Sequence, residues 1–141
     1  MSQTPLVVGG VRLGVAQAGI KRAGKDDLTV IELALNSVCA AVFTRNAFCA
    51  APVCVARKHW RECDHHPRYW VVNTGNANAG TGLEGMNAAE TTCHHVAALC
   101  GCSATDVMPF STGVIGEPLP IDKLNQALPT AIENLSAEGW E

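Results

Sequence analysis

The ten residues from Ser111 to Pro120 carry residue types that acyl-transfer chemistry requires. They read Ser-Thr-Gly-Val-Ile-Gly-Glu-Pro-Leu-Pro, so a small hydroxyl pair precedes a glycine and a helix starting near Pro120 follows. We expect a tight loop in which adjacent backbone N–H groups point at one oxygen anion and a threonine hydroxyl adds a third donor. Such donors stabilise the oxyanion of a tetrahedral intermediate. Taken alone, the run fits a simple turn before a helix better than a catalytic loop.

A second segment rich in glycine, residues 73–82, reads Asn-Thr-Gly-Asn-Ala-Asn-Ala-Gly-Thr-Gly. The spacing of Gly75 and Gly80 matches a phosphate-binding P-loop, but that motif needs Lys followed by Ser or Thr at the next two positions. Thr81 and Gly82 stand there instead, so the lysine that contacts the phosphates is missing and we reject a P-loop NTPase.

The asparagines of this segment leave two roles open. In the first, the glycines make tight turns and the asparagine side chains hydrogen-bond the loop backbone. In the second, the loop also shapes an active site, and the asparagines are candidates for substrate contact. The three candidates are Asn73, Asn76 and Asn78.

Together the two segments resemble the ornithine acetyltransferase (glutamate N-acetyltransferase) family of arginine biosynthesis. Three further stretches fit the same family in the same order. They are residues 19–28 (Gly-Ile-Lys-Arg-Ala-Gly-Lys-Asp-Asp-Leu), 41–46 (Ala-Val-Phe-Thr-Arg-Asn) and 49–53 (Cys-Ala-Ala-Pro-Val). The resemblance extends from residue 9 to the end of the chain. Several co-linear motifs are more specific than any one of them.

The resemblance implies an enzyme that moves an acetyl group from N-acetylornithine to glutamate through an acetyl-threonine intermediate. In that family, the Thr and Gly of Ser-Thr-Gly-Val-Ile-Gly stabilise the oxyanion, and the matching positions here are Thr112 and Gly113. No metal or prosthetic group is implied, and acetyl-CoA is a co-substrate of some members. The implied fold is α/β, a mixed sheet with flanking helices that is part of a self-processing N-terminal-threonine acetyltransferase.

The family nucleophile is missing from these residues. Members are precursors that cleave themselves before a threonine, in a stretch resembling Pro-Asn-Met-Ala-Thr-Met-Leu, and that threonine heads the β chain. No such stretch occurs here. We therefore interpret residues 1–141 as one N-terminal α-chain region, incomplete and inactive alone, which pairs with the β chain of the same precursor in an α2β2 heterotetramer. The alternative is a non-catalytic remnant or a binding and assembly module.

Cysteines and histidines gather in three short clusters that invite a metal site. The clusters are Cys63-Asp64-His65-His66, Cys93-His94-His95 and Cys100-Gly101-Cys102. None forms a paired CxxC unit, and neighbouring residues on a helix point about 100° apart, so we expect surface histidines rather than metal ligands. Three other cysteines lie in apolar, strand-like sequence, where we expect reduced, buried thiols. They are Cys39, Cys49 and Cys54.

Composition limits the remaining classes of function. A net charge of −3 without a basic stripe argues against nucleic acid as a partner. Apolar runs such as Val38–Phe43 are too short to span a bilayer, and Met1–Pro5 lacks the basic region of a signal peptide. We therefore expect a cytoplasmic protein without a membrane partner, with enough apolar residues (48%) for one domain core.

The first half of the chain is predicted to be mainly strands. Residues 7–19 indicate a strand with turns. The alternating, apolar segments Leu28–Leu35 and Val38–Thr44 favour a hairpin. Pro52–Ala56 is predicted as another short strand, and the polar residues 57–68 as a short surface helix or loop.

The second half alternates strands and helices. Tyr69–Asn73 is predicted as a buried strand and Asp106–Phe110 as a short one. Apolar residues at three- and four-residue steps predict a helix over Leu83–Cys100. A last helix begins near Pro120, and Pro129 should divide it into two pieces because proline lacks the N–H and crowds the preceding turn.

Overall fold

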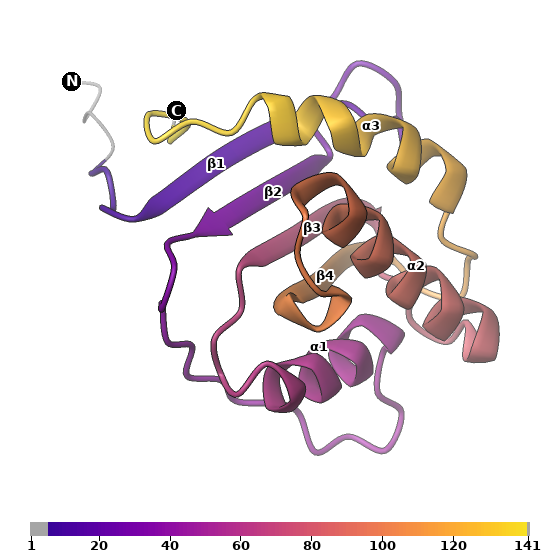
Figure 1. Cartoon of the computed structure of the whole chain (residues 1–141). Helices are drawn as coiled ribbons and strands as arrows, with labels where there is room; N and C mark the ends of the chain where they lie inside the picture. The colour runs from indigo at the N-terminus through magenta and orange to yellow at the C-terminus, as the bar shows by residue number, and fades with distance from the viewer. Residues whose placement is uncertain (1–5, 141) are drawn as a thin grey trace.

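A four-stranded mixed sheet is the framework of residues 6–140, the part of the chain that the computed structural model describes (Figure 1). Its strands are β1 (Val11–Ala16), β2 (Leu28–Leu33), β3 (Tyr69–Asn76) and β4 (Val107–Val114), and they lie in this order across the sheet. The first three are antiparallel to one another, whereas β3 and β4 are parallel. The segment Met1–Pro5, predicted not to be a signal peptide, lies outside the described residues.

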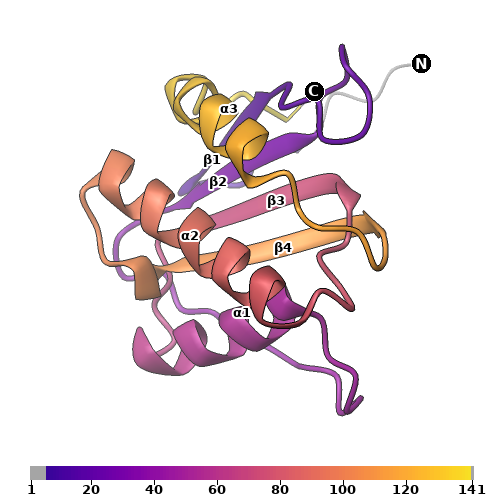
Figure 2. The ribbon, with the colours of Figure 1, turned by 90° about the vertical axis from the view of Figure 1, so that its right-hand side faces the viewer.

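Three helices cover one side of this sheet and one of its edges. They are α1 (Ala51–Glu62), α2 (Gly82–Cys100) and α3 (Ile121–Glu133), and a short 3-10 turn, η1 (Ala104–Asp106), precedes β4. In Figure 2, α2 crosses in front of β3 and β4, while α3 lies toward β1 and β2. Helix α1 packs beside the edge strand β4 and against α2. The predicted class, a mixed sheet with flanking helices, is confirmed.

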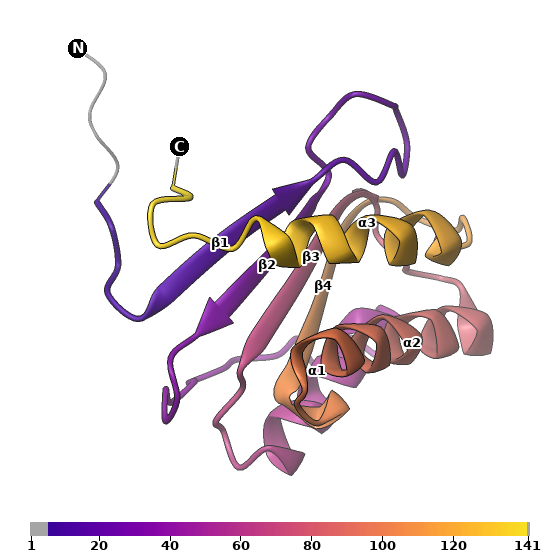
Figure 3. The same ribbon diagram turned by 45° about the horizontal axis from the view of Figure 1, so that its top comes forward.

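The core lies between the sheet and the helices, as the turned view shows (Figure 3). Every second residue of the central strands faces it, which is the period of a strand with one covered face. Val30 of β2 and Val71 of β3 are paired in the register and both are buried. Leu128 of α3 and Val96 of α2 close the core from the helical side and are fully buried.

The predicted hairpin between residues 28–35 and 38–44 is wrong. Strand β2 ends at Leu33 and is paired on both edges, with β1 and with β3, so no free edge remains for a hairpin partner. Residues 38–44 instead run without regular secondary structure along α1, where Trp60 Nε1 donates a hydrogen bond to the Cys39 carbonyl at 2.8 Å.

The predicted strand over Pro52–Ala56 is also wrong, because these residues begin α1. Pro52 stands in the first turn of the helix, where its missing N–H removes no intrahelical bond. The helix prediction for part of 57–68 is confirmed as far as Glu62, but the surface assignment fails at His59. That side chain is buried, with Nδ1 2.8 Å from the Val107 carbonyl oxygen.

Proline 129 does not divide the last helix, contrary to the prediction. Helix α3 is continuous from Ile121 to Glu133, with Pro129 inside it. Leu124, Leu128 and Ala131 are all buried, so one apolar face packs on the sheet on both sides of the proline. Tertiary packing outweighs the one hydrogen bond that proline cannot make. The predictions of α2 and of the strand at Tyr69 are confirmed.

Burial of the cysteines differs from the prediction. Cys39, Cys49 and Cys54 are only half-buried, and none lies in a strand, because the segments predicted as strands are irregular or helical. The fully buried thiol is that of Cys93 on α2. Its burial raises its pKa to about 12.

Candidate active site

The Ser-Thr-Gly segment lies in the last part of strand β4 and not in the tight loop that was predicted. Strand β3 continues beside it as far as Asn76, and this pairing keeps β4 extended to Val114. In the parallel register, Thr74 lies opposite Thr112 and Gly75 opposite Gly113. The turn follows later, with Gly116 at φ +80°. The candidate oxyanion residues Thr112 and Gly113 therefore lie at the end of strand β4.

At Gly113 the backbones of β3 and β4 approach each other closely. Its φ is +132°, and a Cβ atom added there would lie 2.4 Å from the Gly75 carbonyl carbon and 2.6 Å from the Asn76 nitrogen. The register is irregular here, because Asn76 pairs with both Thr112 and Val114. Thr112 and Gly113 are exposed. They lie at the carboxyl end of the parallel pair, where open α/β sheets bind their ligands.

A chain of side-chain hydrogen bonds fixes this strand end. The Ser111 hydroxyl donates to Asn73 Oδ1 at 2.6 Å, and Asn73 Nδ2 donates to the Asn76 carbonyl at 2.8 Å. Asn76 Nδ2 in turn donates to the carbonyls of Glu117 and Pro118 at 3.2 and 3.1 Å. The two asparagines therefore connect β3, the end of β4 and the turn beyond it.

Asn78 ties the same region to the start of α2. It is fully buried, and its Nδ2 donates to the Gly85 carbonyl at 2.9 Å while its Oδ1 accepts from the Thr81 hydroxyl at 2.8 Å. Its backbone N–H donates to Asn76 Oδ1 at 2.7 Å. The bonding of Asn73, Asn76 and Asn78 agrees with the structural role considered for them. Their contact with a substrate remains a prediction.

Sequence reasoning missed Asp27, which holds the connection between β1 and β2 against the site. Its buried carboxylate accepts hydrogen bonds from the backbone N–H groups of Ala18 and Ile20, each at 2.7 Å. The Asp27 carbonyl accepts from the Thr74 N–H at 2.9 Å. A signal was present, because Asp27 lies within the family-like stretch 19–28, but its side chain was given no role.

The model of the ArgJ family matches residues 12–140. The chain belongs to the ArgJ family. It is 60% identical over 134 residues to the arginine biosynthesis bifunctional protein ArgJ of Methylococcus capsulatus, which covers 95% of this chain and 32% of that protein. The ArgJ protein of Pseudomonas fluorescens is 52% identical over the same shares. The chain thus spans about a third of the length of these curated relatives, and the resemblance inferred from its motifs is confirmed.

Two solved structures of the ArgJ family have the same fold. The ornithine acetyltransferase of Mycobacterium tuberculosis, complexed with ornithine, superposes with a TM-score of 0.84 at 32% identity, covering 92% of this chain and 69% of that chain. The bifunctional ArgJ of Bacillus halodurans gives a TM-score of 0.80 at 30% identity, with 93% and 73% covered.

Residues of the first cysteine and histidine cluster, Cys63 and His65, have partners within the protein. The Cys63 thiol donates to the Trp60 carbonyl at 3.6 Å, and the His65 ring stacks on Trp60 with centroids 4.0 Å apart. Within residues 6–140, no three His, Cys, Asp or Glu side chains are grouped as metal ligands. The same part of the chain has no helix that is both long and apolar enough to cross a membrane.

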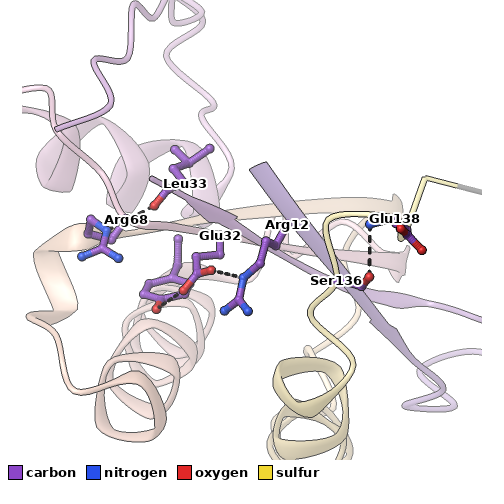
Figure 4. A network of polar contacts seen from close by, with 7 residues as sticks. Arg12, Glu32, Leu33, Arg68, Ser136 and Glu138 are labelled. Atoms are coloured by element: carbon purple, nitrogen blue, oxygen red, sulfur yellow. Dashed lines mark hydrogen bonds and ion pairs between the residues drawn. The ribbon is translucent and has the colours of Figure 1, made fainter. Parts of the chain in front are cut away.

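A second polar cluster lies at the opposite end of the sheet (Figure 4). Glu32 accepts hydrogen bonds from Arg12 and, at 2.9 Å, from the Tyr69 hydroxyl, so it joins β1, β2 and β3. Burial alone would raise the pKa of Glu32, but the donors Arg12 and Tyr69 lower it overall. Burial, followed by the bond to Glu32, raises the pKa of Tyr69. This ion pair is a cross-strand connection remote from Thr112.

Proposed function

We propose that this chain supplies the oxyanion hole of an ArgJ acetyltransferase that moves an acetyl group from N-acetylornithine to glutamate through an acetyl-threonine intermediate. The observation that carries the proposal is the exposed pair Thr112 and Gly113 at the carboxyl end of β4. Two further findings support it. The curated relatives are bifunctional proteins of arginine biosynthesis, and one structural neighbour was solved with ornithine.

In this mechanism, negative charge develops on the acetyl oxygen when the nucleophile attacks the carbonyl carbon. The Thr112 hydroxyl and a backbone N–H at Thr112 or Gly113 donate hydrogen bonds to that oxygen. A preorganised donor of this kind contributes about 3–4 kcal/mol to transition-state stabilisation. The hydrogen bonds of Asn73 and Asn76 keep the donors in place before the substrate arrives. The acetyl group comes with the substrate, so the transfer needs no prosthetic group, and acetyl-CoA is an alternative donor.

The nucleophile in this proposal is a threonine of the β chain. Residues 1–141 are then one N-terminal region of the α chain, which is inactive alone and pairs with the β chain of the same cytoplasmic precursor as an α2β2 heterotetramer. The residues that match the curated relatives make up 32% of the length of those relatives. The proposed nucleophile lies outside this matching region.

The test uses a chimera that carries the rest of an ArgJ protein. This chain replaces the 134 matching residues of the Methylococcus capsulatus relative. Ornithine release from N-acetylornithine and glutamate is measured for the chimera and for its Thr112→Ala variant. We expect kcat to fall by about thirty- to a thousand-fold, equivalent to roughly 2–4 kcal/mol, with a smaller change in KM because the bond forms mainly in the transition state.

Thr29→Ala is the control, since Thr29 is a threonine of strand β2, which strand β3 separates from β4. It should leave kcat unchanged. A Thr112→Ala chimera that melts at a lower temperature but keeps near-normal turnover per folded molecule would remove Thr112 from the oxyanion hole. A folded chimera without any turnover would contradict the proposed reaction.

A further inference from the structure

A single stretch of backbone separates the connection between β1 and β2 from the candidate oxyanion residues Thr112 and Gly113. Gly75 separates the two: a Cβ atom added to Gly75 would lie 3.0 Å from the Cβ of Lys21, and one added to Gly113 would lie 2.4 Å from the carbonyl carbon of Gly75. Glycine at both positions allows the three segments to stack this closely. Lys21 is therefore held near the site by the fold, although 91 residues separate it from Thr112 along the chain.

The connection is anchored on both sides, so its position is defined. The Asp27 carboxylate bonds the N–H groups of Ala18 and Ile20. From the other side, Lys123 Nζ of α3 donates to the Gly19 carbonyl at 3.1 Å. These bonds fix the backbone on either side of the residues that follow Ile20.

Three cationic residues of this connection surround a surface cavity of about 250 Å³ whose wall includes Thr74 and Gly75. The cations are Lys21, Arg22 and Lys25, and all three are exposed. The ion pairs found among residues 6–140 are Arg12–Glu32 and Lys58–Glu90, so none of the three is neutralised within this part of the chain.

Two acidic residues also line the cavity, but both already have partners. Asp27 is buried and its carboxylate oxygens accept from backbone N–H groups. Asp26 Oδ1 accepts a hydrogen bond from Gln17 Nε2 at 3.1 Å. The chain as a whole carries a net charge of −3, whereas the three cations and two carboxylates of this cavity sum to +1, so the charge is reversed locally beside the site.

We propose that Lys21, Arg22 and Lys25 form an anion-binding subsite for the phosphate groups of a phosphorylated acyl donor, of the acetyl-CoA type, whose acetyl group reaches Thr112 and Gly113. This inference rests on the proposed function. Several exposed cations suit a ligand with several phosphates better than a single carboxylate. Arginine contributes a planar fork that can bind phosphate oxygens in pairs, and lysine contributes point charges that follow the remaining oxygens.

Direct binding to the 141-residue chain tests the subsite without requiring any activity. Free coenzyme A is titrated by calorimetry at about 50 and about 300 mM salt, because screening should weaken a contact between exposed charges. The triple variant Lys21→Gln, Arg22→Gln, Lys25→Gln should bind at least about ten-fold more weakly. The control triple Arg45→Gln, Lys58→Gln, Arg61→Gln removes the same charge from exposed positions elsewhere and should change the affinity by less than about two-fold.

Three results would overturn the inference. The first is no binding of coenzyme A to the chain. The second is an equal loss in both triple variants, which would show an effect of overall charge alone. The third is complete displacement of coenzyme A by excess N-acetylornithine, which would assign the cations to the carboxylate of the amino-acid substrate.

The chimera supplies a second readout that separates this inference from the proposed function. Its rate with acetyl-CoA and glutamate is divided by its rate with N-acetylornithine and glutamate. The triple variant of the connection should lower this ratio about ten-fold, through KM for acetyl-CoA, and the control triple should not. An unchanged ratio overturns the subsite. A chimera inactive with both donors contradicts the proposed function, while coenzyme A binding by the chain still decides the subsite.

Discussion

Replacing Gly113 with alanine should destabilise the chain more than the same replacement at an exposed glycine that has free space around it. The new Cβ atom would lie 2.4 Å from the Gly75 carbonyl carbon, 2.6 Å from the Asn76 nitrogen and 2.7 Å from the Gly75 oxygen. Ordinary contacts begin at 3.4 Å, so β3 and β4 must separate by about 1 Å at their ends. Such overpacking costs about 1–3 kcal/mol.

The backbone conformation adds a second penalty at Gly113. A side chain at φ +132° is strained, which typically costs about 1–3 kcal/mol. Together the two effects predict a loss of about 2–6 kcal/mol in the free energy of unfolding. A domain of this size has a total of about 5–15 kcal/mol, so the loss is readily measured.

Urea unfolding of the chain, followed by circular dichroism, is the assay, and Gly116→Ala is the matched control. Gly116 has φ +80° but no atom within 4 Å of its added Cβ, so this variant reports the backbone penalty without the contact. We expect it to lose only about 1–2 kcal/mol. Equal losses in the two variants would refute the argument that the close approach of β3 and β4 requires glycine at position 113.

The remaining predictions concern the opposite end of the sheet and the core. The pKa of Glu32 is lowered in the folded chain, so its ion pair adds stability above the ordinary pKa of 4.5 that is lost as the pH falls through the lower, folded value. Glu32→Gln should therefore flatten the fall in unfolding free energy below about pH 4.5, and parallel pH profiles would contradict this. Cys93, buried and with a pKa raised to about 12, should resist iodoacetamide at about pH 8 until the chain unfolds, whereas half-buried Cys39 should react before Cys93 does. Mass spectrometry of the labelled peptides decides this, and equal rates would disprove it. Leu128→Ala should cost about 2–5 kcal/mol because Leu128 is fully buried, while exposed Leu83→Ala should cost less than about 0.5 kcal/mol in the same urea assay. Similar losses at both leucines would show that burial does not set the cost.

The periodicity of apolar residues correctly predicted those helices and strands that pack one face against the core along most of their length. Helix α2 has apolar residues at three- and four-residue steps, and strand β3 begins with alternating buried residues, so both could be located from sequence. Periodicity failed for residues 38–44 and for the start of α1, which are short apolar runs compatible with more than one structure. Their conformation depends on which strand edges are already occupied and on which surface α1 can cover, and neither is a local property.

The sequence by itself determined the family and the residue types at the site. The Ser-Thr-Gly run and the asparagine- and glycine-rich segment identified Thr112 and Gly113 as candidates, because chemistry depends on side-chain and backbone groups that the sequence states directly. Only the tertiary structure showed that these residues end a strand, that Gly75 lies between Gly113 and Lys21, and that Asp27 holds that arrangement. The physical reason is strand pairing: it brings together backbones from distant parts of the chain, and its register depends on the packing of the whole sheet.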